Sequence, residues 1–212
     1  MGGVSGDLAR ELRDAVGLTH AVETGTYLGG GTRLLAGIFG EVATIELSEE
    51  LHSQAVGELA DLGGVRALQG DSRSVLPTVV RADTPGLYFL DGHWSGGPTA
   101  GEGAECPVLD ELDALAAGHP DDCILIDDAR FFAAPPPPPH DPAQWPTLVE
   151  TFDALRRIRP GHHVTLLGDQ VIAVPERARA VVDAYGQALE REDDAPAPPP
   201  PGGPLGFLRR RA

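Results

Sequence analysis

A carboxylate, an imidazole and an indole follow one apolar stretch of the sequence, and the first two can move protons or bind metal. The run Tyr88-Phe89-Leu90 ends at Asp91, and His93 and Trp94 come just after it. A carboxylate beside an imidazole can hold a cation or transfer a proton, and histidine is the side chain most often used as a general base. We therefore expect His93 and Asp91 to be catalytic and Trp94 to keep water out. A loop histidine bonded to its neighbours and an indole that only packs are the alternatives.

Two further acids, Asp127 and Asp128, follow a second apolar run at 123–126. If the two runs are neighbouring parallel strands, these acids and Asp91 meet at one edge of a sheet. Two like charges at ~4 Å repel by about 4 kcal/mol at an effective dielectric of about 20, which favours a bound proton or a bound cation. Oxygen ligands favour Mg²⁺ or Ca²⁺ over zinc. The alternative is that Asp127 caps the next turn and Asp128 faces solvent.

The stretch ETGTYLGGGT, residues 23–32, is a candidate cofactor loop between a predicted strand and a predicted helix. Gly25 permits a tight turn, and Gly29 and Gly31 let a ligand approach the backbone and the helix N–H groups. Glu46 stands about 20 residues further on, where a strand-end acid can accept hydrogen bonds from ribose hydroxyls. A glycine-rich turn without a ligand is the alternative. The G-x-G-x-x-G spacing of nicotinamide sites is absent.

Strand and helix patterns alternate along the chain and must position these residues. The pattern predicts helices over 7–16, 31–39, 48–62, 73–82 and 107–117, from 147 and over 176–190. It predicts strands near residues 21, 43, 66, 88, 124, 164 and 172. Such alternation is typical of an α/β fold with a doubly wound, mostly parallel sheet of seven strands. Gly168-Asp169 suits a hairpin turn, which brings an antiparallel strand to the edge.

Two long loops, 92–106 and 129–146, follow strands and are expected at the carboxyl edge of the sheet, where ligands bind in this architecture. The second loop contains PPPPP, residues 135–139, which could dock an aromatic groove or stiffen a lid. Residues 1–190 are expected to form one domain. The proline-rich stretch 191–212 is expected to be a disordered tail.

The charge and the cysteines limit the partners of the chain. The 212 residues carry 32 acids and 16 bases, all arginine, for a formal net charge of −16, so nucleic acid and anionic membrane are not expected as partners. No stretch approaches the ~20 apolar residues of a membrane span. The two cysteines, Cys106 and Cys123, indicate a reduced, cytoplasmic protein. A small-molecule or peptide substrate is expected, and a homodimer stays open.

Several motifs resemble those of class I S-adenosylmethionine-dependent methyltransferases over about residues 20–175. Residues 23–29 resemble the first motif, E-x-G-x-x-x-G; IELS (45–48) is similar to the second motif and QGDS (69–72) to the adenine-side motif. FLDGHW followed by LIDD resembles the metal-dependent O-methyltransferases of the catechol and antibiotic-sugar types. The sugar enzymes have LDGD where this chain has LDGH, so His93 stands at the position of their proposed general base.

The resemblance implies a Rossmann-like methyltransferase fold and metal-assisted methyl transfer from S-adenosylmethionine to a hydroxyl oxygen of a small molecule or natural product. It implies that Asp91, Asp127 and Asp128 hold Mg²⁺ or another divalent cation. The implied cofactor-binding residues are Glu23, Gly25, Thr26, Gly29, Gly31, Thr32, Glu46, Asp71, Ser72 and Asp91. A nicotinamide-dependent oxidoreductase and a non-catalytic interaction protein on a degenerate cofactor fold are the alternatives.

Overall fold

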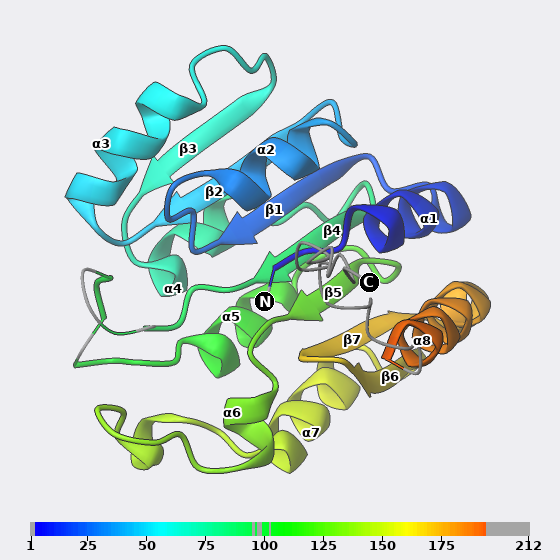
Figure 1. Cartoon of the computed structure of the whole chain (residues 1–212). Coiled ribbons are helices and arrows are strands. Elements are labelled where there is room, and N and C mark those ends of the chain that lie inside the picture. Colours follow the sequence, from blue (N-terminus) through cyan, green and yellow to red (C-terminus); the bar gives the residue numbers. More distant parts are fainter. Residues whose placement is uncertain (1–2, 95, 97–98, 102, 194–212) are drawn as a thin grey trace, which may run out of the picture.

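Seven strands form a single sheet at the centre of the molecule (Figure 1). The computed structural model describes residues 3–94, 96, 99–101 and 103–193. The strands lie in the order β3-β2-β1-β4-β5-β7-β6. Their bounds are β1 (His20–Thr24), β2 (Val42–Glu46), β3 (Val65–Gln69), β4 (Gly86–Leu90), β5 (Cys123–Ile126), β6 (His162–Leu167) and β7 (Gln170–Pro175).

The pairing confirms the predicted doubly wound, mostly parallel sheet. Neighbours from β3 to β5 pair in parallel. Strand β7 pairs antiparallel with β5 on one side and with β6 on the other. The predicted hairpin therefore closes the sheet, with the antiparallel strand β7 next to β5 and with β6 outermost.

Helices cover both faces of the sheet (Figure 1). Their bounds are α1 (Gly6–Val16), α2 (Gly30–Ala36), α3 (Glu49–Glu58), α4 (Ser72–Val75), α5 (Val108–Leu115), α6 (Arg130–Ala133), α7 (Leu148–Ile158) and α8 (Arg179–Asp193). Side chains of α1, α2 and α8 pack in one apolar core and those of α5 and α7 in the other. Strand β4 supplies both cores, because Leu87 and Phe89 point to the first and Tyr88 and Leu90 to the second. Burial on both faces explains its continuous apolar run.

The carboxyl ends of β1, β4 and β5 stop at the same level. Leu90 is the pairing partner of Thr24 in β1 and of Ile126 in β5. The backbone contacts continue one residue further, where the Asp91 N–H donates to the Thr24 carbonyl and the Asp127 N–H to the Leu90 carbonyl. The register therefore brings Asp91 and the residues after β5 to one edge of the sheet, as the sequence predicts.

Some elements differ from those expected. Residues 73–82 form the one-turn helix α4 followed by a 3₁₀ turn at Leu76–Thr78, where Pro77 removes a backbone donor. The stretch 129–146, expected as a loop, contains α6 and a 3₁₀ turn at Pro142–Gln144. The predicted tail falls on 194–212, outside the described residues, apart from 191–193, which end α8. No helix in the described part of the chain has both the length and the apolar character to cross a membrane.

Candidate active site

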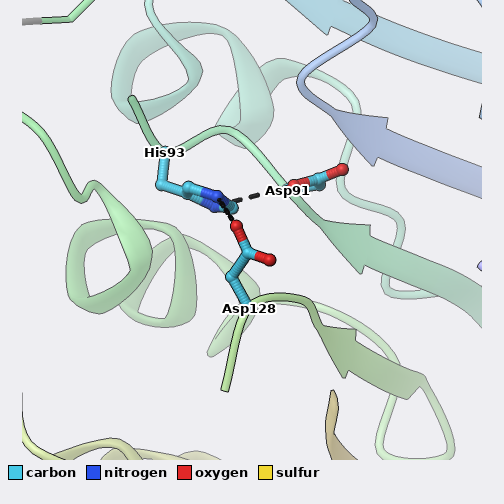
Figure 2. Close-up of side chains that lie close together, drawn as sticks. All are labelled: Asp91, His93 and Asp128. Atoms are coloured by element: carbon cyan, nitrogen blue, oxygen red, sulfur yellow. Dashed lines mark hydrogen bonds and ion pairs between the residues drawn. The ribbon is translucent and has the colours of Figure 1, made fainter. Parts of the chain in front are cut away.

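An imidazole lies between two carboxylates at the carboxyl edge of the sheet (Figure 2). His93 Nε2 is hydrogen-bonded to Asp128 Oδ2, and His93 Nδ1 lies 3.6 Å from Asp91 Oδ1. Asp91 extends from the end of β4, and Asp128 follows β5. His93 is only 8% exposed, so its ring is screened from bulk water, whereas the Asp91 side chain is 32% accessible to solvent. One ligand atom from each residue lies within 4.8 Å of the others, so one ion could contact all three.

Burial and mutual charge set the protonation of the cluster. Burial, together with the charges of Asp127 and Asp128, raises the pKa of Asp91 to about 8 against the opposing effect of His93. Burial alone would lower the pKa of His93, but the hydrogen bond to Asp128 and the charge of Asp91 outweigh it and raise that pKa. Burial would raise the pKa of Asp128, but its bonds to His93 and Arg130 lower it. Asp128 is therefore the ionised partner of His93.

Asp127 does not join this cluster. It is 2% exposed, and its Oδ1 accepts a hydrogen bond from Gln170 Nε2 at 3.5 Å. No ligand atom of Asp127 lies in the group formed by Asp91, His93 and Asp128. Asp128 has a left-handed backbone with φ of 55°, which is uncommon for a non-glycine residue. Of the three acids expected to hold a cation, the structure brings together Asp91 and Asp128, with His93 in the third place.

The loop after β1 makes close contacts that only glycine allows. Gly25 has φ of 83°, and a Cβ on it would lie 2.1 Å from the backbone oxygen of Asp91. A Cβ on Gly31 would lie 2.2 Å from Glu23 Oε1. Glu46 fixes the loop from the other side, because its two carboxylate oxygens accept the N–H groups of Tyr27 at 2.8 Å and Ser48 at 2.9 Å. The loop is therefore held between the ends of β4 and β2.

Glu23 supports the loop from below. Its Oε2 accepts hydrogen bonds from Thr32 Oγ1 at 2.5 Å and Thr44 Oγ1 at 2.8 Å, and Thr44 Oγ1 lies 2.7 Å from Thr26 Oγ1. All four side chains are buried. Burial raises the pKa of Glu23 to about 7, although both hydroxyl donors oppose the shift. This network anchors the first turn of α2 to β1 and β2.

A cavity of about 400 Å³ lies above the loop and beside the cluster. The sequence-predicted residues that line it are Gly25, Glu46, Asp71, Ser72, Asp91 and His93. Asp71 also caps α4 by accepting the Arg73 N–H at 2.9 Å. The other predicted cofactor residues, Glu23, Thr26, Gly29, Gly31 and Thr32, are not among the lining residues. A Cβ on Gly29 would lie 3.1 Å from the Leu59 side chain, so this glycine serves the packing of the loop on the segment after α3.

Solved structures share this architecture, whereas no family model and no curated protein matches the chain. The O-methyltransferase TomG from Streptomyces achromogenes, involved in tomaymycin synthesis and solved with S-adenosylmethionine, is 20% identical with a TM-score of 0.58, covering 82% of each chain. An O-methyltransferase from Bacillus cereus, solved with S-adenosylhomocysteine, is 21% identical with a TM-score of 0.55, again covering 82% of each chain. The chain shares its fold with these two O-methyltransferases.

Within this methyltransferase fold, sequence reasoning missed a contact between the two long loops. Glu105 Oε2 accepts hydrogen bonds from Trp145 Nε1 at 2.7 Å and interacts with His140 Nδ1 at 3.1 Å. The Trp145 ring lies 5.4 Å from that of His93, and the His140 ring lies 5.2 Å from that of Trp94, centroid to centroid. The Trp145 ring therefore packs against His93 and also contacts the His140 ring. No sequence signal joins Glu105 to partners 35 and 40 residues away.

Proposed function

We propose that the chain is an S-adenosylmethionine-dependent O-methyltransferase that acts on a hydroxyl group. The observation that carries this proposal is one cavity lined by the glycine loop, by Glu46 at the end of β2 and by Asp91 and His93. Its volume of about 400 Å³ lies within the usual range of small-molecule sites, about 300–1,000 Å³. S-adenosylmethionine bound there would supply an electrophilic methyl group. The solved structures contribute the fold and the two bound cofactor forms named above.

The site residues predicted from the sequence have different roles in this proposal. Gly25 lines the cavity, and its lack of a side chain lets the loop lie against the Asp91 backbone. Glu46 accepts the Tyr27 N–H of the loop with one carboxylate oxygen and the Ser48 N–H before α3 with the other, and its remaining lone pairs are available to ribose hydroxyls. Asp71 and Ser72 would lie on the adenine side. The buried supports Glu23 and Thr32 hold the loop in place without lining the cavity.

His93 is the proposed general base. An ionised carboxylate only accepts hydrogen bonds, so in neutral His93 the proton is fixed on Nε2 by Asp128 and the Nδ1 lone pair is left toward Asp91. Because the pKa of His93 is raised, this neutral form is reached at higher pH than for an ordinary histidine. The acceptor hydroxyl would give its proton to Nδ1 as its oxygen takes the methyl group and S-adenosylhomocysteine is released, and Asp128 would stabilise the imidazolium that forms. Most of the remaining catalysis is then positioning in a site from which water is excluded.

Metal assistance is the second candidate for the same step. The ligand atoms of Asp91, His93 and Asp128 are close enough for one divalent cation, which would act as a Lewis acid on the hydroxyl oxygen. One nitrogen and two oxygen donors suit a transition ion such as Mn²⁺ better than Mg²⁺. The two candidates differ in one observable, because activity that survives exhaustive chelation supports His93 alone, and activity restored by an added cation supports metal assistance.

The remaining proposals concern the setting of the reaction. A small-molecule or peptide acceptor, natural-product biosynthesis and a cytoplasmic location stay predictions, as do a homodimer and the lack of nucleic-acid and membrane partners. Cys106 and Cys123 are both free thiols, which is compatible with a reducing compartment.

Calorimetry with two glycine variants tests the cofactor proposal. The protein should bind S-adenosylmethionine and S-adenosylhomocysteine in the micromolar range or tighter. Gly25→Ala should abolish binding, because its Cβ would meet the Asp91 backbone in a left-handed conformation. Gly30→Ala is the matched control, since a Cβ there meets nothing within 4 Å. Binding of NADH without binding of S-adenosylmethionine would replace this proposal by an oxidoreductase, and binding of neither would favour the interaction protein.

A further inference from the structure

The turn between β6 and β7 contacts the residues that follow β5. The Asp169 backbone carbonyl accepts the Ala129 N–H at 2.9 Å, and Asp169 Oδ1 accepts the Arg130 N–H at 2.9 Å. Asp169 Oδ2 also forms an ion pair with Arg130 Nη1. A turn distant in sequence therefore fixes both the backbone and the side chain at the start of α6.

Arg130 carries this contact to the candidate active site. Its Nη1 lies 2.5 Å from Asp128 Oδ1, while the other carboxylate oxygen of Asp128 bonds His93 Nε2. The Arg130 guanidinium also lies over the Phe131 ring, 4.4 Å from its centroid. The four residues Asp169, Arg130, Asp128 and His93 thus form a continuous chain of charged contacts from the edge hairpin to the imidazole.

The contact of Arg130 with Asp169 matters because Arg130 is exposed. Its side chain is 52% accessible to solvent, whereas that of Asp128 is 13% accessible. A long exposed side chain with a single partner loses much of its interaction to rotamer entropy and solvent screening. A second carboxylate on the same guanidinium, together with the ring beneath it, restricts those rotamers. Asp128, in its uncommon left-handed conformation, then has a fixed cation on the side away from His93.

We infer that Asp169 is a positioning residue for His93, acting through Arg130 and Asp128. The inference rests on one part of the proposed function, namely that His93 takes the proton of the acceptor hydroxyl. With Arg130 in place, Asp128 Oδ1 is occupied and Oδ2 is directed to His93 Nε2, which leaves Nδ1 on the side of Asp91. Without Asp169, Arg130 is free to leave, and Asp128 can rotate away from the imidazole.

Three variants separate positioning from support of the turn. Asp169→Ala removes both the bond to the Arg130 N–H and the ion pair. Asp169→Asn can keep the bond to the N–H through its amide oxygen but lacks the charge. Asp113→Asn is the matched control, because Asp113 forms an exposed ion pair with Arg157 between α5 and α7, and neither residue lines the cavity. Thermal unfolding establishes that each variant is folded, and Asp169→Asn decides the question if Asp169→Ala is not.

The spectroscopic readout is the ring N–H proton of His93, assigned by its loss in His93→Gln. In the wild type this proton should resonate far downfield and exchange slowly, because it is held by a buried carboxylate. In Asp169→Asn this proton should exchange with solvent about ten times faster, and in Asp169→Ala faster still. In Asp113→Asn its exchange rate should not change. An unchanged resonance in the folded Asp169 variants overturns the inference. The measurement needs neither cofactor nor acceptor, so failure of the cofactor calorimetry would leave its result standing.

Activity gives a second readout. With an acceptor in hand, Asp169→Asn should lower kcat by about 10- to 100-fold, the usual effect of losing an outer partner of a site residue. The affinity for S-adenosylmethionine should stay within about twofold, because Asp169 and Arg130 do not line the cofactor cavity. A loss of cofactor affinity equal to the loss of kcat would indicate a general structural defect and would contradict a positioning role.

Discussion

Glu23 lies beneath the glycine loop with two hydroxyl donors on its carboxylate, and that place gives it a measurable effect on stability. Burial raises its pKa to about 7, from the 4.5 of an exposed glutamate. The folded protein therefore binds a proton more tightly than the unfolded chain. Unfolding releases that proton between about pH 4.5 and pH 7, so the contribution of Glu23 to the free energy of unfolding falls as the pH rises through this window.

A Glu23→Gln variant tests this effect. The amide keeps an oxygen for Thr32 and Thr44 but does not titrate. Relative to the variant, the wild type should lose up to about 1.4 kcal/mol of unfolding free energy per pH unit within the window and change little above it. Denaturant unfolding at several pH values measures the difference. His20, whose pKa burial lowers to about 4, titrates with the opposite sign and cancels because both proteins contain it. A difference independent of pH would contradict the buried carboxyl.

The side chains of the site show which residue roles a sequence can predict. Asp91, His93 and Glu46 follow directly after strands or end them, and strand register alone places such residues at the cavity. The roles of Glu23 and Asp127 could not be predicted without the directions of their side chains. Glu23 bonds Thr32 beneath the loop, and Asp127 bonds Gln170. Motif spacing identifies a loop that contacts a ligand, but it does not separate residues that line the cavity from those that support them.

At the scale of elements, α7 begins with a capping box formed by Thr147 and Glu150. Thr147 Oγ1 accepts the Glu150 N–H at 3.2 Å, and Glu150 Oε2 accepts the Thr147 N–H at 2.8 Å. Thr147→Ala should lower the free energy of unfolding by about 1 kcal/mol, since one backbone donor loses its partner. Thermal unfolding should show this as a decrease of about 2–4 °C in Tm. Thr147→Ser keeps the hydroxyl and is the control. An equal decrease in Tm in both variants would mean that the capping hydrogen bond does not contribute to stability.

Strands with a continuous apolar run and helices with a periodic apolar pattern were predictable from the sequence, and elements without either were not. Strands β4 and β5 are apolar throughout because both of their faces are buried, and α1 has its buried leucines at Leu8 and Leu12. The short helix α6 has no such period. It exists because Asp169 accepts the Arg130 N–H and Phe132 enters the core, and both contacts are made with segments distant in sequence. Local patterns carry no information on such contacts.

The charge of the whole molecule predicts how its stability depends on salt. The formal net charge is −16, so the folded state brings many like charges together. Of the ion pairs between described residues, Arg159 with Asp122 is deeply buried, whereas pairs such as Arg33 with Asp61 are exposed and contribute little. Salt shortens the screening length from ~30 Å at about 0.01 M to ~10 Å at about 0.1 M, which weakens long-range repulsion more than close pairs.

Raising sodium chloride from about 10 mM to about 150 mM should therefore raise the Tm by a few degrees at neutral pH. For a chain of this length, each kcal/mol gained in the free energy of unfolding raises the Tm by about 2–4 °C. Chloride is preferred to sulfate, which strengthens apolar burial in any protein. The matched variant is Glu11→Gln with Glu190→Gln, which removes two exposed acids. It should melt higher than the wild type at low salt, and the difference should shrink as salt is added. A Tm that falls with salt would show that attractive ion pairs outweigh the net negative charge.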